Sequence, residues 1–453
     1  MKTIKRRNFL EKSMTASVGT LVGVDPFVRK NPSANDSINV AVVGIRGRGR
    51  DHYRALAKFP DVRITTLCDI DERLFDEAVS DVEKLTGYKP EVETDYRSIL
   101  DNQDIDVVSL ATPNHWHALQ TIWACQAGKD VYVEKPVSHT LQEGRKMVEA
   151  ARKYNRVVQT GTQARSNPST IDAVDFATSG QLGKIYMAKG LCFKPRGSIG
   201  HTKDEQVPPG VHWDRFLGPA PYRPFNPNRF HYKWHWFWDT GNGDFGNQGI
   251  HQADIARWIL QQDNHPVVIR GYGDYLMLDS DQETPNIQQL IFEYEDGNLL
   301  QFEVRGLPSN SEGDLRIGNL IYGSQGWMRM GNEEQAVNQA FRGKIQLNPS
   351  GFSSYEEETG PDFGDPNISS ADTNHFHFEN FFNCVKSRKW QDLNADILQG
   401  HLSTSLCHLG NIACRLGRTL HFNPHAETFV DDPEADTYLT KQYRPPYVLP
   451  AQV

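Results

Sequence analysis

The sequence lacks the features of a membrane-spanning or a nucleic-acid-binding protein. Past its first 35 residues, no stretch approaches the ~18 uninterrupted apolar residues that a membrane-spanning helix requires. Positive charge is not in excess either, because the formal net charge is −9 at pH 7. A general nucleic-acid-binding protein would show a basic face. We therefore expect neither a membrane span nor a nucleic-acid partner.

Cysteine is also scarce, and its pattern excludes the common cysteine-based sites. The six cysteines include no CxxC pair and no spacing typical of zinc ligands. Cys68 and Cys125 lie in apolar segments, as small buried hydrophobic side chains do. The histidines near the C-terminus (His375, His377, His401 and His408) show no spacing that requires a metal, and we interpret them as structural. We expect no metal site and no disulfide.

What the chain does have is length and burial capacity. Its 453 residues allow two domains, and 38% of them are hydrophobic, with nine tryptophans. A disordered chain could not supply so much apolar surface, so the protein is expected to be globular.

The N-terminal segment resembles a twin-arginine (Tat) export signal. Arg6 and Arg7 are followed by Asn-Phe-Leu, and residues 13–24 are small, weakly apolar and uncharged. Such signals are addresses read by a receptor and do not anchor the protein. We expect residues 1–35 to be a signal and linker outside the fold, and the protein to be exported to the periplasm.

The first folded part, residues 36–160, is predicted to be a Rossmann domain. Short apolar runs that read as buried strands alternate with helix-like segments, a pattern that indicates a doubly wound parallel sheet. The strand-like runs are residues 38–43, 62–68, 107–111, 131–133 and 157–160, and the helix-like segments are residues 74–85, 117–127 and 141–154.

Beyond residue 160 the pattern changes to strands with few helices between them. Residues 301–304 alternate polar and apolar side chains, which favours an antiparallel sheet with one solvated face. These four residues belong to the strand-like run 298–304, and further strand-like runs are residues 185–193, 267–278 and 287–294. We predict an α+β substrate and oligomerisation domain over 161–430, with a loop at 351–370, helices within 374–416, and an extended C-terminal strap at 431–453. An open sheet of this kind suits a homo-oligomer, either a dimer or a tetramer.

A glycine-rich turn follows the first predicted strand. Residues 44–49 read Gly-Ile-Arg-Gly-Arg-Gly, so that Gly44, Gly47 and Gly49 are candidates for a pyrophosphate-binding turn, although the second glycine comes one residue late. Asp69 ends the second strand 25 residues after Gly44, where a carboxylate binds ribose hydroxyls and repels a 2′-phosphate. NAD is therefore favoured over NADP, although the nearby Arg46 and Arg48 could weaken that preference.

Three further motifs resemble those of one oxidoreductase family. Residues 111–117 (Ala-Thr-Pro-Asn-His-Trp-His) follow the third strand, residues 134–136 (Glu-Lys-Pro) follow the fourth, and residues 246–258 open a helix of the second domain. With the glycine-rich turn, these motifs resemble the Gfo/Idh/MocA family, named for glucose–fructose oxidoreductase and inositol dehydrogenase. The resemblance covers nearly the whole chain after the N-terminal segment.

The resemblance implies roles for particular residues. Thr112, Asn114 and His117 would lie along the nicotinamide ribose and pyrophosphate, Glu134 at the edge of the cofactor, and Lys135 at the reacting carbon. The implied cofactor-binding set is Gly44, Arg46, Gly47, Gly49, Asp69, Thr112, Asn114, His117, Glu134 and Lys135. The family's second-domain pair is an Asp followed four residues later by a His, but here Asn247 precedes His251. An asparagine can orient a hydroxyl and cannot take its proton.

Residue chemistry supports the same assignment. Oxidising a secondary alcohol needs a hydride acceptor and a base, and a lysine can be that base if desolvation lowers its pKa. We take Lys135 and His251 as the catalytic candidates. The candidate substrate contacts are Gln163, Arg165, Trp236, Asn247 and His251; Trp236 is the middle one of three tryptophans at alternate positions, which either pack in a wall or stack on a sugar.

Three functions fit this sequence. The first is an NAD-dependent oxidoreductase with tightly bound cofactor, acting on a ring hydroxyl or carbonyl of a sugar, glycoside or cyclitol. The second is a redox-neutral enzyme that cleaves glycosides by oxidation and elimination and then returns the hydride. The third is a non-catalytic sugar-binding protein, against which the presence of both Lys135 and His251 argues.

Overall fold

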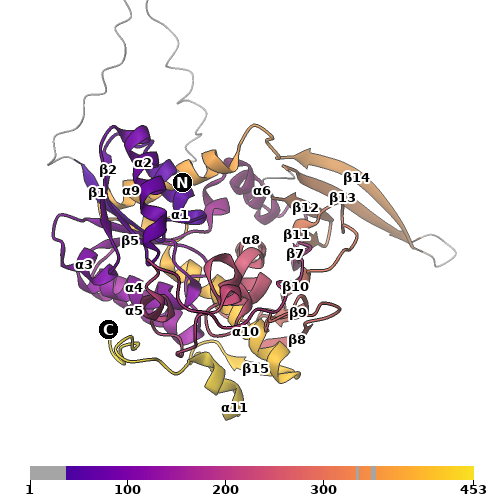
Figure 1. Cartoon of the computed structure of the whole chain (residues 1–453). Coiled ribbons are helices and arrows are strands. Elements are labelled where there is room, and N and C mark those ends of the chain that lie inside the picture. Colours follow the sequence, from indigo (N-terminus) through magenta and orange to yellow (C-terminus); the bar gives the residue numbers. More distant parts are fainter. Residues whose placement is uncertain (1–36, 333–335, 348–352) are drawn as a thin grey trace, which may run out of the picture.

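The computed structural model describes residues 37–332, 336–347 and 353–453, which form two sheets with helices packed around them (Figure 1). The twin-arginine motif and the segment behind it lie outside these residues. Within the described part of the chain, no helix combines the length and the apolar character needed to cross a bilayer.

The first sheet has six parallel strands in the order β3-β2-β1-β4-β5-β6. They are β1 (Ile38–Val43), β2 (Val62–Cys68), β3 (Glu91–Glu93), β4 (Val107–Leu110), β5 (Asp130–Val133) and β6 (Val158–Thr160). All residues of β4 (Val-Val-Ser-Leu) and β5 (Asp-Val-Tyr-Val) are buried, which explains why their sequences are largely apolar and do not alternate with exposed polar residues. The predicted doubly wound sheet is confirmed. Only β3 was not predicted, because this three-residue edge strand carries two exposed or half-exposed glutamates.

Helices cover both faces of this sheet. They are α1 (Arg48–Leu56), α2 (Phe75–Thr86), α3 (Tyr96–Asp101), α4 (Asn114–Gln126) and α5 (Leu141–Lys153). One buried cluster joins α4 and α5 to the sheet, and another joins α1 and α2 to its other face. The second cluster also includes α9 (Ser370–Ser387), where the Phe378 ring stacks on Tyr132 at 4.3 Å between centroids. A late segment of the chain thus returns to complete the first domain.

The second sheet has ten strands in the order β14-β13-β12-β11-β7-β10-β9-β8-β15-β16. All neighbours pair antiparallel except β7 and β10, which are parallel. The strands are β7 (Ile185–Cys192), β8 (Val268–Asp274), β9 (Ile287–Glu293), β10 (Leu299–Arg305), β11 (Ile317–Gly323), β12 (Gly326–Gly331), β13 (Asn338–Leu347), β14 (Ser353–Asp362), β15 (Leu420–Asn423) and β16 (Thr428–Phe429). The predicted, largely antiparallel second domain is confirmed.

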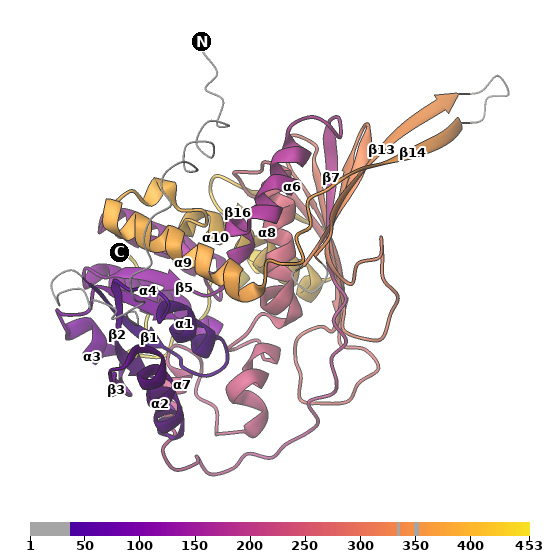
Figure 2. The same ribbon diagram turned by 90° about the horizontal axis from the view of Figure 1, so that it is seen from above.

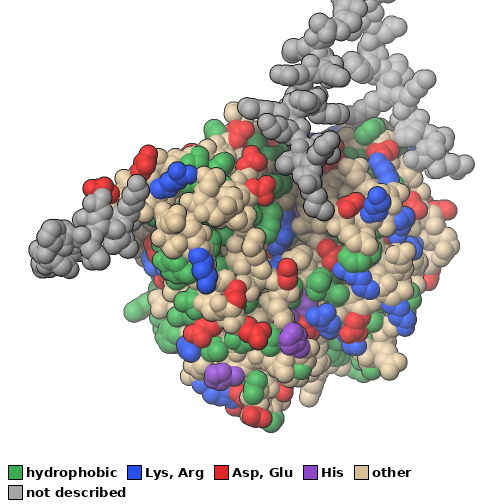
Figure 3. Space-filling view, turned by 180° about the vertical axis from the view of Figure 1, so that it is seen from behind, with side chains coloured by type: hydrophobic (Ala, Val, Ile, Leu, Met, Phe, Trp, Pro, Cys, Tyr) green, Lys and Arg blue, Asp and Glu red, His purple; other side chains and the backbone are tan. Residues whose placement is uncertain are grey.

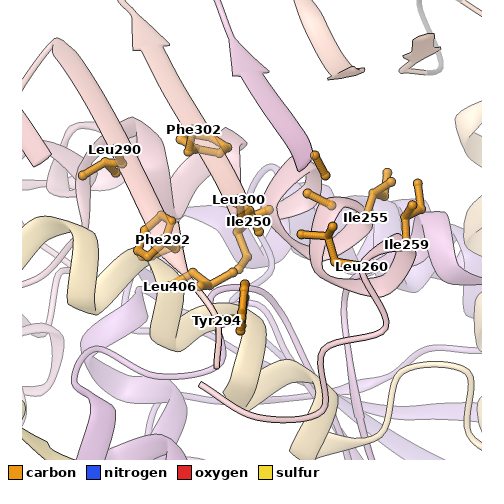
Figure 4. Packing of buried hydrophobic residues seen from close by; sticks show 14 of the residues in the cluster. Ile250, Ile255, Ile259, Leu260, Leu290, Phe292, Tyr294, Leu300, Phe302 and Leu406 are labelled. Carbon is orange, nitrogen blue, oxygen red and sulfur yellow. The ribbon is translucent and has the colours of Figure 1, made fainter. Parts of the chain in front are cut away.

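Helices α6 (Pro168–Thr178), α8 (Ile250–Ile259) and α10 (Ile397–Leu416) pack on one face of this sheet. Figure 4 shows Phe292 of β9 and Phe302 of β10 directed toward Ile250 of α8 and Leu406 of α10. Burying the aromatic rings of β9 and β10 under α8 fixes the position of the segment that opens α8. The face seen in Figure 3 carries charged side chains of both signs, interspersed rather than gathered in one area.

The remaining elements are short. They are α7 (Trp213–Leu217), α11 (Pro433–Asp436), the π-helical turn η6 (Phe245–Gly249) and the 3₁₀ turns η2 (Glu72–Leu74), η3 (Gln163–Ser166), η4 (Pro227–Arg229), η5 (His231–Trp236), η7 (Trp390–Asp392) and η8 (Thr437–Leu439).

The prediction of a loop at 351–370 was wrong over much of its length. Residues 353–362 form β14, which pairs with β13 in a hairpin that extends beyond the rest of the sheet (Figures 1 and 2). The strand includes three successive glutamates and a Gly-Pro pair, so it has no apolar alternation. A strand at the edge of a sheet that is exposed to solvent does not need that alternation.

A buried ionic cluster joins η3, α8 and α10. Arg165 donates two hydrogen bonds to Asp254, at 2.8 and 2.9 Å, and Ser403 Oγ donates a third to Asp254 Oδ1 at 2.6 Å. Arg257 Nε donates to Ser403 Oγ at 2.9 Å. Since Asp254 and Arg257 are each only 1% exposed, this carboxylate compensates buried positive charge.

We predict that Asp254→Ala destabilises the protein by about 3–5 kcal/mol, because it leaves two buried guanidinium groups without their carboxylate. Thermal and denaturant unfolding of the purified protein measure this effect. Glu293→Ala is the control, since Glu293 pairs with Arg270 at the surface and its loss should cost about 1 kcal/mol or less. Equal effects of the two substitutions would contradict the assignment.

Candidate active site

Two cavities meet at the carboxyl ends of the parallel strands. The first, with a volume of about 340 Å³, runs along the ends of β1, β2, β4 and β5. The second, of about 310 Å³, lies between η3, the start of α8 and the start of α9. Arg48 and Lys135 line both cavities. The first cavity includes the point where the strand order reverses, between β1 and β4, which is where doubly wound sheets bind their ligands.

The glycine-rich turn forms the floor of the first cavity. Gly44 has φ +80°, and a Cβ there would lie 2.7 Å from the Ala111 carbonyl oxygen. A Cβ on Gly49 would lie 1.6 Å from the Gly44 oxygen, so this glycine allows α1 to pack against the turn. Gly47 has φ +51° with open space beside it. The turn therefore presents bare backbone and the N-terminus of α1 to the cavity, as a pyrophosphate requires.

Asp69 stands beside this turn at the end of β2. Its Oδ2 accepts a hydrogen bond from the Ile45 N–H at 2.9 Å, and its Oδ1 accepts one from the Asp71 N–H at 3.0 Å. Burial raises the pKa of Asp69 to about 6, against the effect of these two hydrogen bonds. The carboxylate lines the first cavity, where it can accept further hydrogen bonds from ribose hydroxyls, and the exposed Arg46 lines the same cavity.

Glu134 is the centre of a buried polar cluster. Its Oε1 accepts hydrogen bonds from Arg48 Nε at 2.7 Å, Gln163 Nε2 at 3.0 Å and His52 Nε2 at 3.1 Å. Burial favours the neutral acid, but the Arg48 guanidinium and the His52 ring hold the pKa of Glu134 well below its usual range. A Cβ on Gly161 would lie 2.7 Å from the Glu134 carboxyl carbon, so this glycine leaves room for the carboxylate.

The sequence analysis missed His52, and it considered Arg48 only for its effect on the preference for NAD over NADP, not as a partner of Glu134. Arg48 also donates to Asn374 Oδ1 at 2.8 Å, and so connects the glycine-rich turn to α9. The position of Arg48 inside the glycine-rich turn could have indicated that it belongs to the site. His52 gave no such indication, because a histidine four residues further along a helix is not distinguishable from a core residue.

Lys135 follows Glu134 at the boundary between the cavities. Its Nζ donates to the main-chain oxygen of Asn247 at 2.5 Å. Burial lowers the pKa of Lys135 to about 8; Glu134 opposes this shift, and the cations Arg48, Lys194 and Arg196 add to it. A lysine with this pKa exchanges a proton near neutral pH.

The second domain contributes His251 and Asn247 from the start of α8 and from η6. His251 lines the second cavity together with Lys135. Burial lowers the pKa of His251 to about 3, with a further lowering by Lys135, so its ring is neutral. The Asn247 side chain donates to the Tyr232 hydroxyl at 3.0 Å. Asn247 therefore holds Lys135 through its backbone, while its side chain faces the first cavity.

Thr112, Asn114 and His117 line the first cavity, but their side chains already have partners. Thr112 Oγ1 donates to Gln120 at 2.6 Å, and Asn114 Nδ2 donates to Asn242 at 2.9 Å. The two His117 ring nitrogens each lie 2.7 Å from a carbonyl oxygen, of Pro136 and of Thr112. His117 therefore ties together the loops after β4 and β5.

Two of the expected substrate contacts, Arg165 and Trp236, are corrected by the structure. Arg165 is 6% exposed and bound to Asp254, and Trp236, the last residue of η5, is 4% exposed; neither lines either of the two cavities described above. Trp234 and His235 line the first cavity instead, stacked at 3.6 Å between ring centroids. Gln163 does line the second cavity, with its amide directed at Glu134.

The second cavity is lined mainly by uncharged polar groups. Besides His251 and Gln163 these include Asn167, Thr170, Gln248, Gln252, Asn338, Ser370 and Asn374. Amides and hydroxyls of this kind both donate and accept hydrogen bonds. They suit a ligand that carries several hydroxyl groups.

Among the described residues, one group has metal-ligand chemistry, and it lies away from both cavities. It consists of His265, His401 and Glu427. Both rings hydrogen-bond Glu427 Oε1, at 2.7 and 2.9 Å, and Arg145 Nε donates to its other oxygen at 3.1 Å. We interpret this carboxylate, already paired with a guanidinium, as a structural link between α5, α10 and the β15–β16 turn.

Comparison with known proteins follows the same division into two domains. Residues 38–162 match the family model described as oxidoreductase family, NAD-binding Rossmann fold, and residues 188–311 and 351–449 match the C-terminal alpha/beta domain of the same family. A levoglucosan dehydrogenase of Pseudarthrobacter phenanthrenivorans is 30% identical over 228 residues, which are 49% of this chain and 51% of that protein. A glycosyl hydrolase family 109 protein of Shewanella baltica is 29% identical over 177 residues, which are 34% of this chain and 39% of that protein.

Solved structures share the fold. A levoglucosan dehydrogenase in complex with NADH and levoglucosan has a TM-score of 0.61 at 18% identity, over 85% of this chain and 99% of that one. The WlbA dehydrogenase of Bordetella pertussis, in complex with NADH and UDP-GlcNAcA, has a TM-score of 0.60 at 20% identity, also over 85% and 99%. With both family models matched in order over most of its length, the chain belongs to the Gfo/Idh/MocA oxidoreductase family.

Proposed function

We propose that this protein is an NAD-dependent oxidoreductase that oxidises a ring hydroxyl, or reduces a ring carbonyl, of a sugar, glycoside or cyclitol. The observation that carries the proposal is the position of Lys135. Lys135 lines both the groove that contains the glycine-rich turn and Asp69, and the second cavity, which is lined by amides and hydroxyls. A proton acceptor between a hydride acceptor and an alcohol is what such a reaction needs.

The residues present fit NAD. The bare turn at Gly44 and Gly47 accommodates a pyrophosphate, and Asp69 is available to the adenosine ribose. Bound NAD supplies a carbon that accepts the hydride from the substrate carbinol. Lys135 Nζ takes the hydroxyl proton as the carbon–oxygen double bond forms, so that an alcohol yields a ketone, a hydride and a proton.

The surrounding groups tune and orient Lys135. The bond to the Asn247 carbonyl holds Nζ at the boundary of the two cavities. The ionised Glu134 lies behind it, and the neutral His251 ring can hydrogen-bond the same substrate oxygen from the second domain. Asn247 has no proton to exchange, so the proton handling falls to Lys135.

The substrate class is supported by the lining of the second cavity and by relatives. One partial relative is named a levoglucosan dehydrogenase, and fold neighbours are dehydrogenases solved with levoglucosan and with UDP-GlcNAcA. Because the matched segments cover only 39% and 51% of the two curated relatives' lengths, their substrates are not assigned to this chain.

A second candidate function is redox-neutral glycoside cleavage. It is favoured by the several relatives named glycosyl hydrolase family 109 proteins. Incubating the protein with aryl glycosides separates the two functions. A keto-sugar with stoichiometric electron transfer to an acceptor indicates the oxidoreductase, whereas free aglycone without net oxidation indicates cleavage. Binding of a sugar with neither product would leave a non-catalytic sugar-binding protein.

Lys135→Ala should lower turnover by about 10²–10⁴-fold and leave NAD bound, because proton transfer rather than affinity is lost. In the unchanged protein the neutral amine accumulates as pH rises through the Lys135 pKa of about 8. The rate of alcohol oxidation should therefore rise as the pH passes through about 8 and become constant at higher pH. The rate of the reverse reduction should fall over the same range. Stopped-flow absorbance of the nicotinamide measures both directions. Lys146→Ala, at the surface of α5, is the control; a pH-independent rate would contradict the assignment.

Asp69→Ala should weaken NAD binding by at least about tenfold and reduce the preference for NAD over NADP, because the carboxylate that repels a 2′-phosphate is removed. Isothermal calorimetry with both dinucleotides tests this. Asp76→Ala, exposed on α2, should change neither affinity. An unchanged ratio of the two affinities would assign the discrimination to other groups.

We further propose that the protein is exported by the Tat route with its cofactor already bound. A dinucleotide is not expected to be available outside the cytoplasm, so an exported enzyme must fold around NAD and retain it. The purified protein should keep NAD(H) through dialysis, show ping-pong kinetics with a second substrate or electron acceptor, and need no added NAD.

Replacing Arg6 and Arg7 together by lysine should retain the protein in the cytoplasm, because the receptor reads the arginine pair. Cell fractionation and immunoblotting measure the distribution. A double substitution at Lys2 and Lys12, each to arginine, keeps the charge of the segment without creating a second arginine pair and serves as the control. Export that persists without the arginine pair, or a native cytoplasmic location, would remove the premise of cofactor retention.

A further inference from the structure

The C-terminal strap, residues 431–453, crosses back from the second sheet to the first domain. After β16 it passes through α11 and η8, and the chain then lies beside α4 and α5 (Figure 1). Val453 is buried in the cluster that also includes Ile122 of α4 and Met147 of α5. The strap is therefore part of the packing of the nucleotide-binding domain, although its sequence follows the second domain.

The first anchor of the strap is Lys441. Its Nζ lies 2.8 Å from Glu143 Oε1 and 3.0 Å from His139 Nδ1, and the Tyr443 hydroxyl donates to the same Glu143 oxygen at 3.1 Å. The other Glu143 oxygen accepts from the N–H groups of His139 and Thr140 at the start of α5. Since Glu143 is 1% exposed, the lysine of the strap compensates a fully buried carboxylate next to the Glu134-Lys135-Pro136 motif.

The second anchor is Arg444, which binds the short helix α7. Its guanidinium donates to the Asp214 side chain at 2.5 Å, to the Asp214 carbonyl at 2.8 Å and to the Gly218 carbonyl at 2.9 Å. Arg215 of α7 donates to Thr94 Oγ1 at 2.7 Å, and Thr94, which follows β3, also lines the first cavity. Arg215 and Phe216 both line that cavity, so the strap holds in place a helix that forms part of its wall.

The third contact is Tyr447, which itself lines the first cavity. Its ring meets Trp116 edge to face, at 5.2 Å between centroids, and Trp116 meets Trp123 in the same way at 6.3 Å. Trp116 Nε1 donates to the Phe216 carbonyl at 3.0 Å, which joins the aromatic group to α7. Trp116 and Trp123 lie two helical turns apart on α4, and both rings line the first cavity together with Tyr447.

We propose that the strap is part of the dinucleotide site: Arg444 and Tyr447 close the adenine end of the groove, and NAD leaves only when the strap and α7 move away. The inference rests on the proposed NAD-dependent function. Asp69, which is placed to bind the adenosine ribose, lines the same groove as the rings of Tyr447, Trp116 and Trp123, and an adenine ring packs against flat aromatic surface of this kind. Arg444 acts through α7 and is a positioning residue, whereas Tyr447 forms the wall itself.

Enclosure by the strap should lower the dissociation rate of NAD as well as strengthen its binding. A ligand enclosed by a segment that is held by a buried ion pair (Lys441–Glu143) and by the Arg444 hydrogen bonds to α7 dissociates at the rate at which that segment opens. The strap thus supplies a physical means for the retention that an exported NAD enzyme needs.

The test is the rate of NAD loss from the full-length protein. The holoprotein is mixed with excess etheno-NAD, and release of the original cofactor is followed by fluorescence of the incoming analogue and by chromatography. Tyr447→Ala and Arg444→Gln should each accelerate release by at least tenfold. Val448→Ala, which alters an exposed side chain of the same strap, is the matched control and should leave the rate unchanged. Unchanged release in both variants would overturn the proposal.

A second measurement covers the case in which a variant fails to fold. Amide hydrogen exchange of the unchanged protein, with and without NAD, should show residues 441–449 and α7 protected by the cofactor. Equal exchange in the two states would overturn the proposal. Failure of the NAD-dependent function itself would look different, because the purified protein would then carry no dinucleotide and its cofactor-free form would bind no NAD by calorimetry.

Discussion

The buried carboxylate of Glu134 is the interaction on which the rest of the site depends. One oxygen accepts hydrogen bonds from Arg48 of the glycine-rich turn, His52 of α1 and Gln163 of η3. An ionised carboxylate inside a protein is tolerated only with such compensation. Because Arg48 and His52 come from α1 and Gln163 comes from η3, satisfying one charge fixes the turn, the end of β5 and the entrance to the second domain relative to one another.

This constraint also determines the environment of Lys135. The lysine follows Glu134 directly, its amino group reaches the backbone of η6, and burial among other cations brings its pKa to about 8. The carboxylate behind it keeps that pKa from falling further. Glu134 thereby helps to position Lys135 at the boundary of the two cavities and limits the lowering of the lysine pKa. Glu134 itself lines only the first of these two cavities.

The two domains are more interleaved than their sequence order suggests. α9 packs against the first sheet through Phe378 and is tied to the glycine-rich turn by the Arg48–Asn374 hydrogen bond. The strap returns to α5 and α7 from the opposite side. The nucleotide-binding domain is therefore completed by segments from late in the chain. Both segments contribute residues to the cavity walls: α9 to the second cavity and the strap to the first.

Local sequence alone determined the parallel sheet, the glycine-rich turn and the candidate Asp69, because buried strands, tight turns and strand-end residues leave short-range patterns of hydrophobicity and glycine. The candidates Lys135 and His251 came from motifs that resemble those of the family. Local sequence did not reveal β14, since an exposed edge strand needs no apolar face. Only the tertiary structure decided which polar groups face a cavity. It paired Arg165 with Asp254 and brought His52 to Glu134, because partners 89 and 82 residues apart meet only when the elements pack, and it buried Trp236. The same reason applies to Tyr447, whose place beside Trp116 follows from the return path of the strap and from nothing in its neighbouring sequence.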